Sequence, residues 1–178
     1  WLPAARLLPP RCRVTQFDEL VRLPDADIDL ARACLLIAKD AYPGIDVDGY
    51  VGEIERFAAR LRALLPAACA SEERIVVLNE FLFDELGFSG NTDNYYDPRN
   101  SYLNEVIDRR TGIPITLAVL YMELGRRVGL AFEGVSFPGH FLVRIGLRGG
   151  VLVLDPFSGG VPQSESELRE RLKRVIPE

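Results

Sequence analysis

The sequence predicts an α+β fold, with helices first and a small antiparallel sheet after them. Apolar residues recur every three or four positions through most of the stretch from 28 to 128, as amphipathic helices require. After Gly129 the pattern changes to three short β-rich runs, and Gly149-Gly150 separates two of these runs as a hairpin turn does. Helices and strands that are segregated along the chain are typical of α+β proteins.

The length and composition predict one compact unit. The chain has 178 residues, of which 48% are hydrophobic and 26% are charged. This length supports one well-buried core and is too short for two domains of usual size. We expect an extended arm at 1–16, where prolines interrupt the chain, a helical part at 17–90, and a core at 91–178 that ends in a helix.

Charge and cysteine usage narrow the function classes. The formal charge of −5, from 21 basic and 26 acidic residues, argues against a nucleic-acid-binding surface. The proline-containing N-terminal stretch has no long apolar run, so neither a signal peptide nor a membrane span is predicted. Cys12, Cys34 and Cys69 match no disulfide or zinc pattern, which favours a reducing, cytoplasmic location. One histidine with scattered acids is a poor ligand set, so no metal or cofactor is expected.

Four helices are predicted in the helical part, separated by prolines. The second carries apolar residues over much of its circumference, so we expect it to be buried. Cys34 lies in the middle of this helix and is interpreted as a small buried hydrophobe rather than a reactive thiol. The predicted spans and N-caps are 17–23; 28–41 with Asp25 or Asp27; 47–65 with Asp46 or Asp48; and 71–86 with Ser71.

A polar loop follows at 87–100. It is rich in glycine, asparagine and aspartate and contains the adjacent Tyr95 and Tyr96. Loops of this composition lie at the surface and often carry function, but hydrogen bonds to the local backbone explain the Asn and Asp residues equally well. Asn100 or Ser101 is expected to cap the short helix that comes next.

A buried helix and three strands complete the predicted core. The helix begins at Gly112-Ile113-Pro114 and runs to Val128, with proline in its first turn, where the missing N–H costs nothing. Its apolar residues predict a central position. The strands are expected at 132–137, 141–147 and 151–154, and a last helix at 165–175.

One chain order in this core is typical of a catalytic site. His140, the single histidine, begins a predicted strand and Asp155 ends the next, so a hairpin brings both to the same end of the sheet. A helix start followed by His and Asp is the order of a nucleophile–His–Asp site. A thiol at the helix start would gain from the helix dipole, but Pro114 stands there and has no ionisable atom. The spacing fits equally well a structural histidine and a turn-forming aspartate.

The motifs of this region resemble a known family. The pattern R-x-G-x-C-x-x-x-A, then G-L, G-H-x-x-V and L-D-P, is that of the transglutaminase-like core of the papain-like superfamily. In this chain it stands at Arg110–Ala118, with Pro114 for Cys, Gly129-Leu130, Gly139–Val143 and Leu154–Pro156. More narrowly, YYDPRNSYLNEVIDRRTGIPITLAVLY with GVSFPGHFLVR is similar to the bacterial SirB/YchA-like family, and the likeness covers about residues 17–160.

The resemblance implies a fold and the roles of three residues. It implies that the predicted helix packs on the antiparallel sheet as a transglutaminase-like core. His140 matches the catalytic histidine, Asp155 the aspartate that orients it, and Pro114 the position of the nucleophilic cysteine. In this family the domain is often followed by tetratricopeptide-like helices, so such helices are an expectation for a longer chain.

We therefore expect a catalytically impaired domain that binds a protein or peptide as a regulatory module. The alternative is a hydrolase or acyl-transfer enzyme in which His140 and Asp155 activate water or Thr116, although a threonine hydroxyl on a helix more often bonds a backbone carbonyl. The candidate residues of the binding cleft are Thr116, Asn100, Tyr95, Tyr96 and Arg99.

Overall fold

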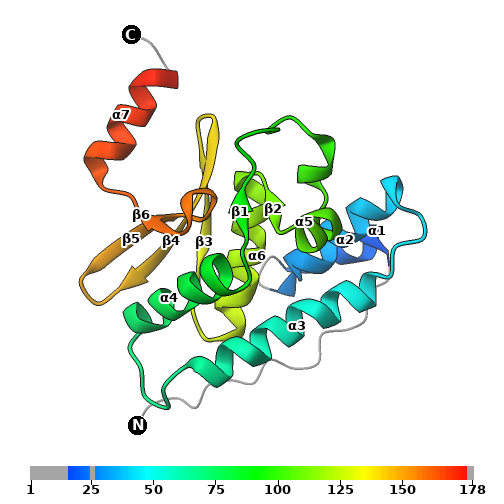
Figure 1. The fold of residues 1–178 in the computed structure, drawn as a ribbon, viewed down its shortest axis with the longest axis horizontal. Helices are drawn as coiled ribbons and strands as arrows, with labels where there is room; N and C mark the ends of the chain where they lie inside the picture. Colours follow the sequence, from blue (N-terminus) through cyan, green and yellow to red (C-terminus); the bar gives the residue numbers. More distant parts are fainter. Residues whose placement is uncertain (1–15, 25–26, 176–178) are drawn as a thin grey trace.

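The computed structural model describes residues 16–24 and 27–175, so the arm predicted at 1–16 lies outside the described residues except for Gln16. The helices are α1 (Phe17–Leu20), α2 (Leu30–Ala41), α3 (Val47–Leu64), α4 (Ser71–Asn79), α5 (Leu103–Arg109), α6 (Pro114–Arg127) and α7 (Glu165–Val175). The strands are β1 (Ser89–Gly90), β2 (Thr111–Gly112), β3 (Glu133–Phe137), β4 (His140–Leu147), β5 (Gly150–Asp155) and β6 (Val161–Pro162). A π-helical segment, η2 (Glu80–Glu85), and two 3-10 turns, η3 (Pro98–Ser101) and η4 (Pro156–Ser158), complete these elements. The predicted α+β class is confirmed (Figure 1).

Helix α6 stands at the centre of the fold, with the four-stranded sheet on one side and α2, α3 and α5 on the other (Figure 1). Residues 116–121 of this helix are all buried, as the continuous apolar run predicts. The one polar group that Tyr121 brings into the core is satisfied, since its hydroxyl donates to Asn79 Oδ1 at 2.8 Å. Burial also raises the pKa of Tyr121, so this hydroxyl stays protonated as a donor. The central position predicted for this helix agrees with the structure.

The larger sheet is antiparallel in the order β3-β4-β5-β6. The hairpin between β3 and β4 turns through Pro138 and Gly139, and Gly139 has φ 69°, a conformation that favours glycine. In the register of the next pair, Val143 lies opposite Leu154. The beginning of β4 and the end of β5 therefore meet at one end of the sheet, as the sequence predicts.

Three short strands are not predicted by the sequence. Strand β6 adds two residues to the edge of the larger sheet, and β1 pairs with β2 in a two-stranded parallel sheet. Two-residue strands are too short to show an alternating pattern. The β1–β2 pair joins the polar loop to the segment before α6: the N–H of Ser89 donates to the carbonyl of Arg110, and that of Asn91 to Gly112.

The structure corrects the prediction for the second helix. Helix α2 begins at Leu30, and its N-cap is Asp29, whose side chain accepts from the N–H of Arg32 at 3.0 Å. The sequence predicts Asp25 and Asp27 for the cap and the first turn, but Asp27 lies before the helix and Asp25 lies outside the described residues. The N–H of Asp27 instead closes a turn onto Pro24. The helix is also not buried all round, because Ile37 is 49% exposed. Three alanines that widen its apolar pattern, Ala31, Ala33 and Ala38, are buried, whereas the larger Leu30 and Ile37 are exposed.

Four other predicted helix limits need correction. Ser71 is the first residue of α4 rather than its cap, and the Glu73 side chain accepts from the N–H of Ala70. The N-cap of α5 is Tyr102, because Asn100 and Ser101 form part of η3. The fourth predicted helix continues to Glu85 as a π-helix, and α1 ends at Leu20. The observed N-caps of α4 and α5, Ala70 and Tyr102, are not the residue types that propensity favours, and neither makes a side-chain cap hydrogen bond.

Candidate functional site

His140 and Asp155 form a hydrogen-bonded pair at the end of the sheet. The Nε2 atom of His140 lies 2.8 Å from Asp155 Oδ1, and the side chain of His140 is 11% exposed while that of Asp155 is fully buried. If Nε2 carries the proton in the neutral ring, Nδ1 is an acceptor, and no group in the described part of the chain hydrogen-bonds to it. The pair therefore has the geometry of a base and its orienting carboxylate.

The Asp155 carboxylate is held by four donors. Besides His140, it accepts from the N–H of Phe157 at 3.1 Å, from Ser158 Oγ at 3.0 Å and from the guanidinium of Arg171 at 3.2 Å. Burial acts to raise the pKa of Asp155, but the hydrogen bond and charge of His140, the Ser158 hydroxyl and Arg171 outweigh it and lower that pKa below its ordinary value. The carboxylate is thus ionised at neutral pH and fixes the orientation of the imidazole.

The start of α6 contains no nucleophile. Pro114 is the first residue of the helix and is buried. Thr116, two residues on, is 6% exposed, and its hydroxyl accepts from the N–H of Ile113 at 3.1 Å and donates to the carbonyl of Asn100 at 2.9 Å. This hydroxyl caps the helix and ties it to the polar loop, a common use of threonine at a helix start.

The polar loop is organised around Asn100. This residue is fully buried, and its amide nitrogen donates to the carbonyls of Asn94 and Tyr95 at 2.9 and 3.1 Å. Its amide oxygen accepts from Asn91 at 3.0 Å and from Arg109 at 3.3 Å. A buried amide with all these partners rigidifies the loop that it crosslinks.

An ion pair holds the far side of the same loop. The side chain of Arg99 donates to Asp97 Oδ1 at 3.1 Å and to Oδ2 at 3.0 and 2.6 Å, and Asp97 also accepts from the backbone N–H of Arg99. These hydrogen bonds lower the pKa of Asp97 to about 2. The Arg99 side chain is more than half exposed, so the pair lies at the surface.

Aromatic rings connect the loop to the His140–Asp155 pair. Tyr96 is 91% exposed and stands edge-to-face with Tyr95 at 5.3 Å between ring centroids. Tyr95 meets Phe157 at 6.0 Å, and Phe157 meets the imidazole of His140 at 5.8 Å. We call these four residues the aromatic row. It leads from an exposed tyrosine to a nearly buried imidazole, and edge-to-face contacts of this length are favourable.

The predicted site residues divide into three groups. His140 and Asp155 contact each other, whereas Asn100 and Thr116 are buried and hydrogen-bonded within the protein. The exposed group lies on the polar loop and consists of Tyr95, Tyr96 and Arg99. Sequence reasoning missed Phe157, Ser158 and Arg171 as partners of the pair. The position of Ser158, three residues after Asp155, was a usable signal, but Arg171 comes from a distant helix and left none.

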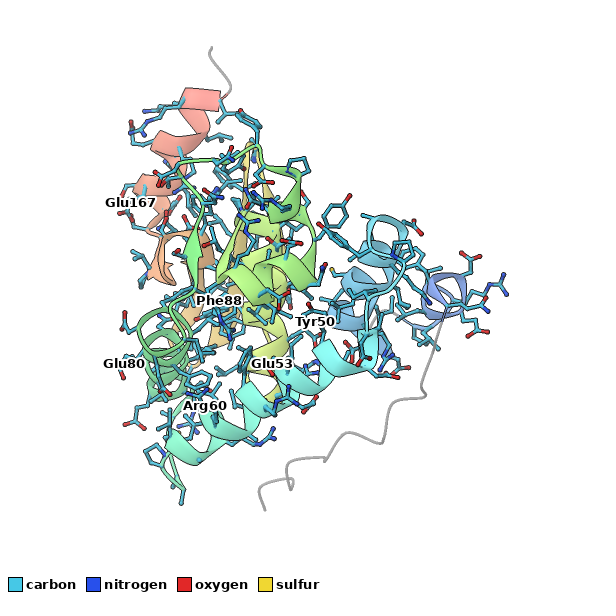
Figure 2. The ribbon with its side chains drawn as sticks, turned by 45° about the vertical axis from the view of Figure 1, so that its right-hand side comes forward. Tyr50, Glu53, Arg60, Glu80, Phe88 and Glu167 are labelled. Atoms are coloured by element: carbon cyan, nitrogen blue, oxygen red, sulfur yellow. The ribbon has the colours of Figure 1, made fainter. Side chains whose placement is uncertain are left out.

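A hollow that the sequence does not predict lies between α3 and α5, away from the His140–Asp155 pair. It has a volume of about 480 Å³, and its lining includes Tyr50, Glu53, Asp108 and Arg110. Tyr50 donates to Asp108 at 2.6 Å, and this hydrogen bond with burial raises the pKa of Tyr50 to about 12. Figure 2 shows Tyr50 and Glu53 well apart from Glu167, which marks α7. Neither His140 nor Asp155 lines this hollow.

The remaining candidate groups give little chemistry. Cys34 is partly buried, and burial with nearby acids raises its thiol pKa to about 11, so it is a poor nucleophile; Cys12 lies outside the described residues. Within 16–24 and 27–175, no three His, Cys, Asp or Glu residues are grouped as metal ligands. None of the described helices combines the length and apolarity that a bilayer crossing demands.

Comparisons with known proteins identify relatives of this chain by sequence. A UPF0162 protein of Xylella fastidiosa (strain 9a5c) is 45% identical over 157 residues, 88% of this chain and 56% of that protein. A UPF0162 protein of Vibrio cholerae is 30% identical over 146 residues, 80% of this chain and 54% of that protein. F-box only protein 21 of Mus musculus is 46% identical over 67 residues, 38% of this chain and 11% of that protein. No solved structure matches.

The chain spans little more than half the length of these bacterial relatives. The model of one family, the transglutaminase-like superfamily, matches residues 48–178. This match covers α3 to α7, and with it the helix start, the histidine and the aspartate that the sequence singles out. The chain therefore belongs to the transglutaminase-like superfamily and, within it, is related to the bacterial UPF0162 proteins, which form the YchA/SirB-like family.

Proposed function

We propose that this protein is a catalytically impaired transglutaminase-like domain that binds a peptide or a protein segment as a regulatory module. The observation that carries this proposal is the His140–Asp155 hydrogen bond, together with proline as the first residue of α6, the position that we assign to the family's cysteine from the motif resemblance. Acyl transfer by this family needs a thiolate, and proline cannot be acylated. In this proposal Pro114 faces the pair across the remnant of the acyl-donor cleft.

Other nucleophiles fit poorly. The hydroxyl of Thr116 already donates to Asn100, so its attack on a substrate would leave a buried carbonyl without its partner. Cys34 has a thiol pKa of about 11 and is therefore protonated at neutral pH. Neither group supports acyl transfer at the start of α6.

The surface beside the pair suits an extended peptide. The aromatic row offers Tyr95 and Tyr96 as exposed rings, and a rigid loop holds them, because Asn100 crosslinks its backbone. Exposed tyrosines on a rigid frame give a large contact area with little loss of side-chain freedom. We expect a bound segment to lie along the row toward His140.

A hydrolase remains the second candidate because of one observation. The Nδ1 atom of His140 has no partner in the described part of the chain, so it can accept a proton from water. A hydrolase of this kind would need neither a cysteine nor Thr116.

The experiment compares binding and turnover in the same protein. Peptides selected from a displayed library on the wild-type domain should lose at least tenfold in affinity for Tyr96→Ala and should bind Val76→Ala normally, since Val76 is an exposed residue of α4. Amine incorporation into glutamine peptides and ester hydrolysis should not exceed those of His140→Ala. Hydrolysis that His140→Ala abolishes would establish the enzyme instead. Selection of peptides that ignore Tyr96 would contradict the proposed surface.

Three further expectations belong to this proposal. The core at 91–178 acts with the preceding helices as one unit, as the main hydrophobic cluster, which spans both parts, supports. The protein works in the cytoplasm. Tetratricopeptide-like helices extend the longer relatives, and limited proteolysis of a full-length relative would locate the junction.

A further inference from the structure

Helix α7 is supported by its own sequence rather than by the core. None of its residues is buried. Its start is a reciprocal cap, in which Glu167 accepts from the N–H and hydroxyl of Ser164, and the N–H of Glu167 donates to Ser164 Oγ. Exposed ion pairs of Arg169 with Glu165 and of Lys173 with Glu170 stabilise it further. Such a helix can form without being packed.

One face of α7 nevertheless points to the His140–Asp155 pair. Leu168, Arg171, Leu172 and Val175 recur at the spacing of a single helix face. Arg171 donates to Asp155 Oδ2 at 3.2 Å and is the least exposed cation of the helix, at 31%. One turn later, Val175 lies within 3.7 Å of the Cβ position of Gly139, the neighbour of His140. In Figure 1, α7 and the β3–β4 hairpin tip lie at the same end of the molecule.

We propose that α7 is a displaceable latch over the His140–Asp155 pair, closed by the contact between Arg171 and Asp155. This inference rests on the proposed function, because it assigns the regulation of the same binding surface. In the closed state α7 covers the buried end of the aromatic row. In the open state Asp155 keeps His140, Ser158 and the Phe157 N–H as partners, so the pair stays intact when the helix leaves.

The location of the latch contact favours this role. Among the described residues, Arg171 is the only partner of the Asp155 carboxylate that does not come from β4 or η4, and its helix has no buried residues. A contact between an unburied helix and a carboxylate that keeps its other partners can be broken without disturbing the core. Salt and a competing cation would both weaken it.

The test uses the single histidine of the chain. Diethyl pyrocarbonate modifies His140, and the limiting rate at alkaline pH, where the ring is neutral in every variant, measures access to it. Arg171→Gln should raise this rate about fivefold, the scale of one lost partly exposed ion pair. Arg169→Gln is the matched control, because it removes the same charge from the exposed face of the same helix. Heteronuclear NOE values for 168–175 should fall only in Arg171→Gln.

Added salt should raise the wild-type rate toward that of Arg171→Gln and leave the variant unchanged. Equal rates in the wild type and both variants would overturn the latch. Faster modification of His140 in Arg171→Gln with unchanged NOE values in α7 would also overturn it. So would lower NOE values with an unchanged modification rate, since the latch requires both effects together. No peptide is used, so an intact latch with no peptide binding would reject only the proposed function.

Discussion

Helices α6 and α7 contact the same site in opposite ways. Helix α6 has 14 residues, ten of them buried, whereas α7 has 11 residues and none is buried. The first packs at the centre of the fold, and the second reaches the site through Arg171 and Val175. Helix α6 therefore forms one side of the site as part of the core, and we call it the fixed wall. Helix α7 forms the other side and is held by contacts that can be broken singly, so we call it the detachable wall.

The sequences of the two helices explain the difference. PITLAVLYMELGRR carries its charges only at its end, where Glu123 accepts from Arg126 and Arg127. ESELRERLKRV is mostly charged and keeps a single narrow apolar stripe. The hydrophobic effect scales with the apolar area removed from water, so only α6 has enough of it to be anchored.

The largest effect should separate the two helices by stability. Leu120→Ala in α6 removes a fully buried side chain and should lower the free energy of unfolding by roughly 3 to 5 kcal/mol, because it leaves a cavity. Leu172→Ala in α7 removes one that is 38% exposed and should cost less than about 1 kcal/mol. Urea unfolding at neutral pH measures both. Similar losses would remove the distinction between a fixed and a detachable wall.

The second-largest effect concerns the carboxylate of Asp155, which lies between the two walls. Asp155→Asn leaves the partners of a buried charge unpaired and should lower the free energy of unfolding at pH 7 by roughly 3 kcal/mol. The folded-state pKa of Asp155 is lowered, so its contribution is present above the ordinary pKa near 4 and is lost as the pH falls through the folded value. Unfolding curves between pH 7 and pH 3 should therefore be less pH-dependent in the variant. Arg171→Gln should show much less than this loss, because it opens only the detachable wall.

The third effect concerns the fixed wall alone. Thr116→Val removes the hydroxyl that joins α6 to Asn100 and should cost about 1 to 2 kcal/mol. Thr92→Val, at an exposed position of the same loop, is the matched control and should cost little. The NMR signals of Tyr95 and Tyr96 should broaden only in Thr116→Val. If both variants behave alike, the hydroxyl does not organise the loop.

The parts of this fold that the sequence predicts are those in which apolar residues recur periodically. The spans of α3, α6, α7 and the three longer strands follow the sequence closely, since each has a sustained apolar pattern. The cap of α2 does not, because several nearby aspartates could fill that position and one local hydrogen bond selects Asp29. The short strands β1, β2 and β6 do not either, because two residues are too few to show an alternating pattern. Propensity favours several capping residues, and tertiary packing selects among them.

The residues of the candidate site likewise fall into those whose contacts the sequence predicts and those whose contacts it does not predict. The hairpin register is local, so the meeting of His140 and Asp155 follows from two strands and a turn. The role of Asn100 does not, because its side-chain amide bonds three residues of the polar loop and Arg109 of α5, and no periodic pattern marks these partners. The contact of Arg171 is even harder to predict, because nothing in the sequence of α7 shows which surface its apolar stripe faces.

The last variant, Pro114→Cys, should change the free energy of unfolding least and the chemical reactivity of the site most. Pro114→Cys places a thiol at the first position of α6, where proline is favoured but not required, so the free energy of unfolding should change by less than about 1 kcal/mol. If Pro114 faces the free Nδ1 of His140, the thiolate gains both the helix dipole and the imidazole. Its pKa should then fall below the free value of about 8.5 and far below that of Cys34.

Ile115→Cys separates these two causes, because it presents a thiol from the same helix turn at an exposed position. Iodoacetamide rates across pH should give a lower thiol pKa for Pro114→Cys than for Ile115→Cys, and His140→Ala should raise only the former. Turnover is not expected, since a misplacement of about 1 Å in the oxyanion donors can cost a hundredfold. A Pro114→Cys thiol that titrates like that of Ile115→Cys, with or without His140, would show that the pair is structural. The imidazole of His140 would then face no remnant of a nucleophile site at the start of α6.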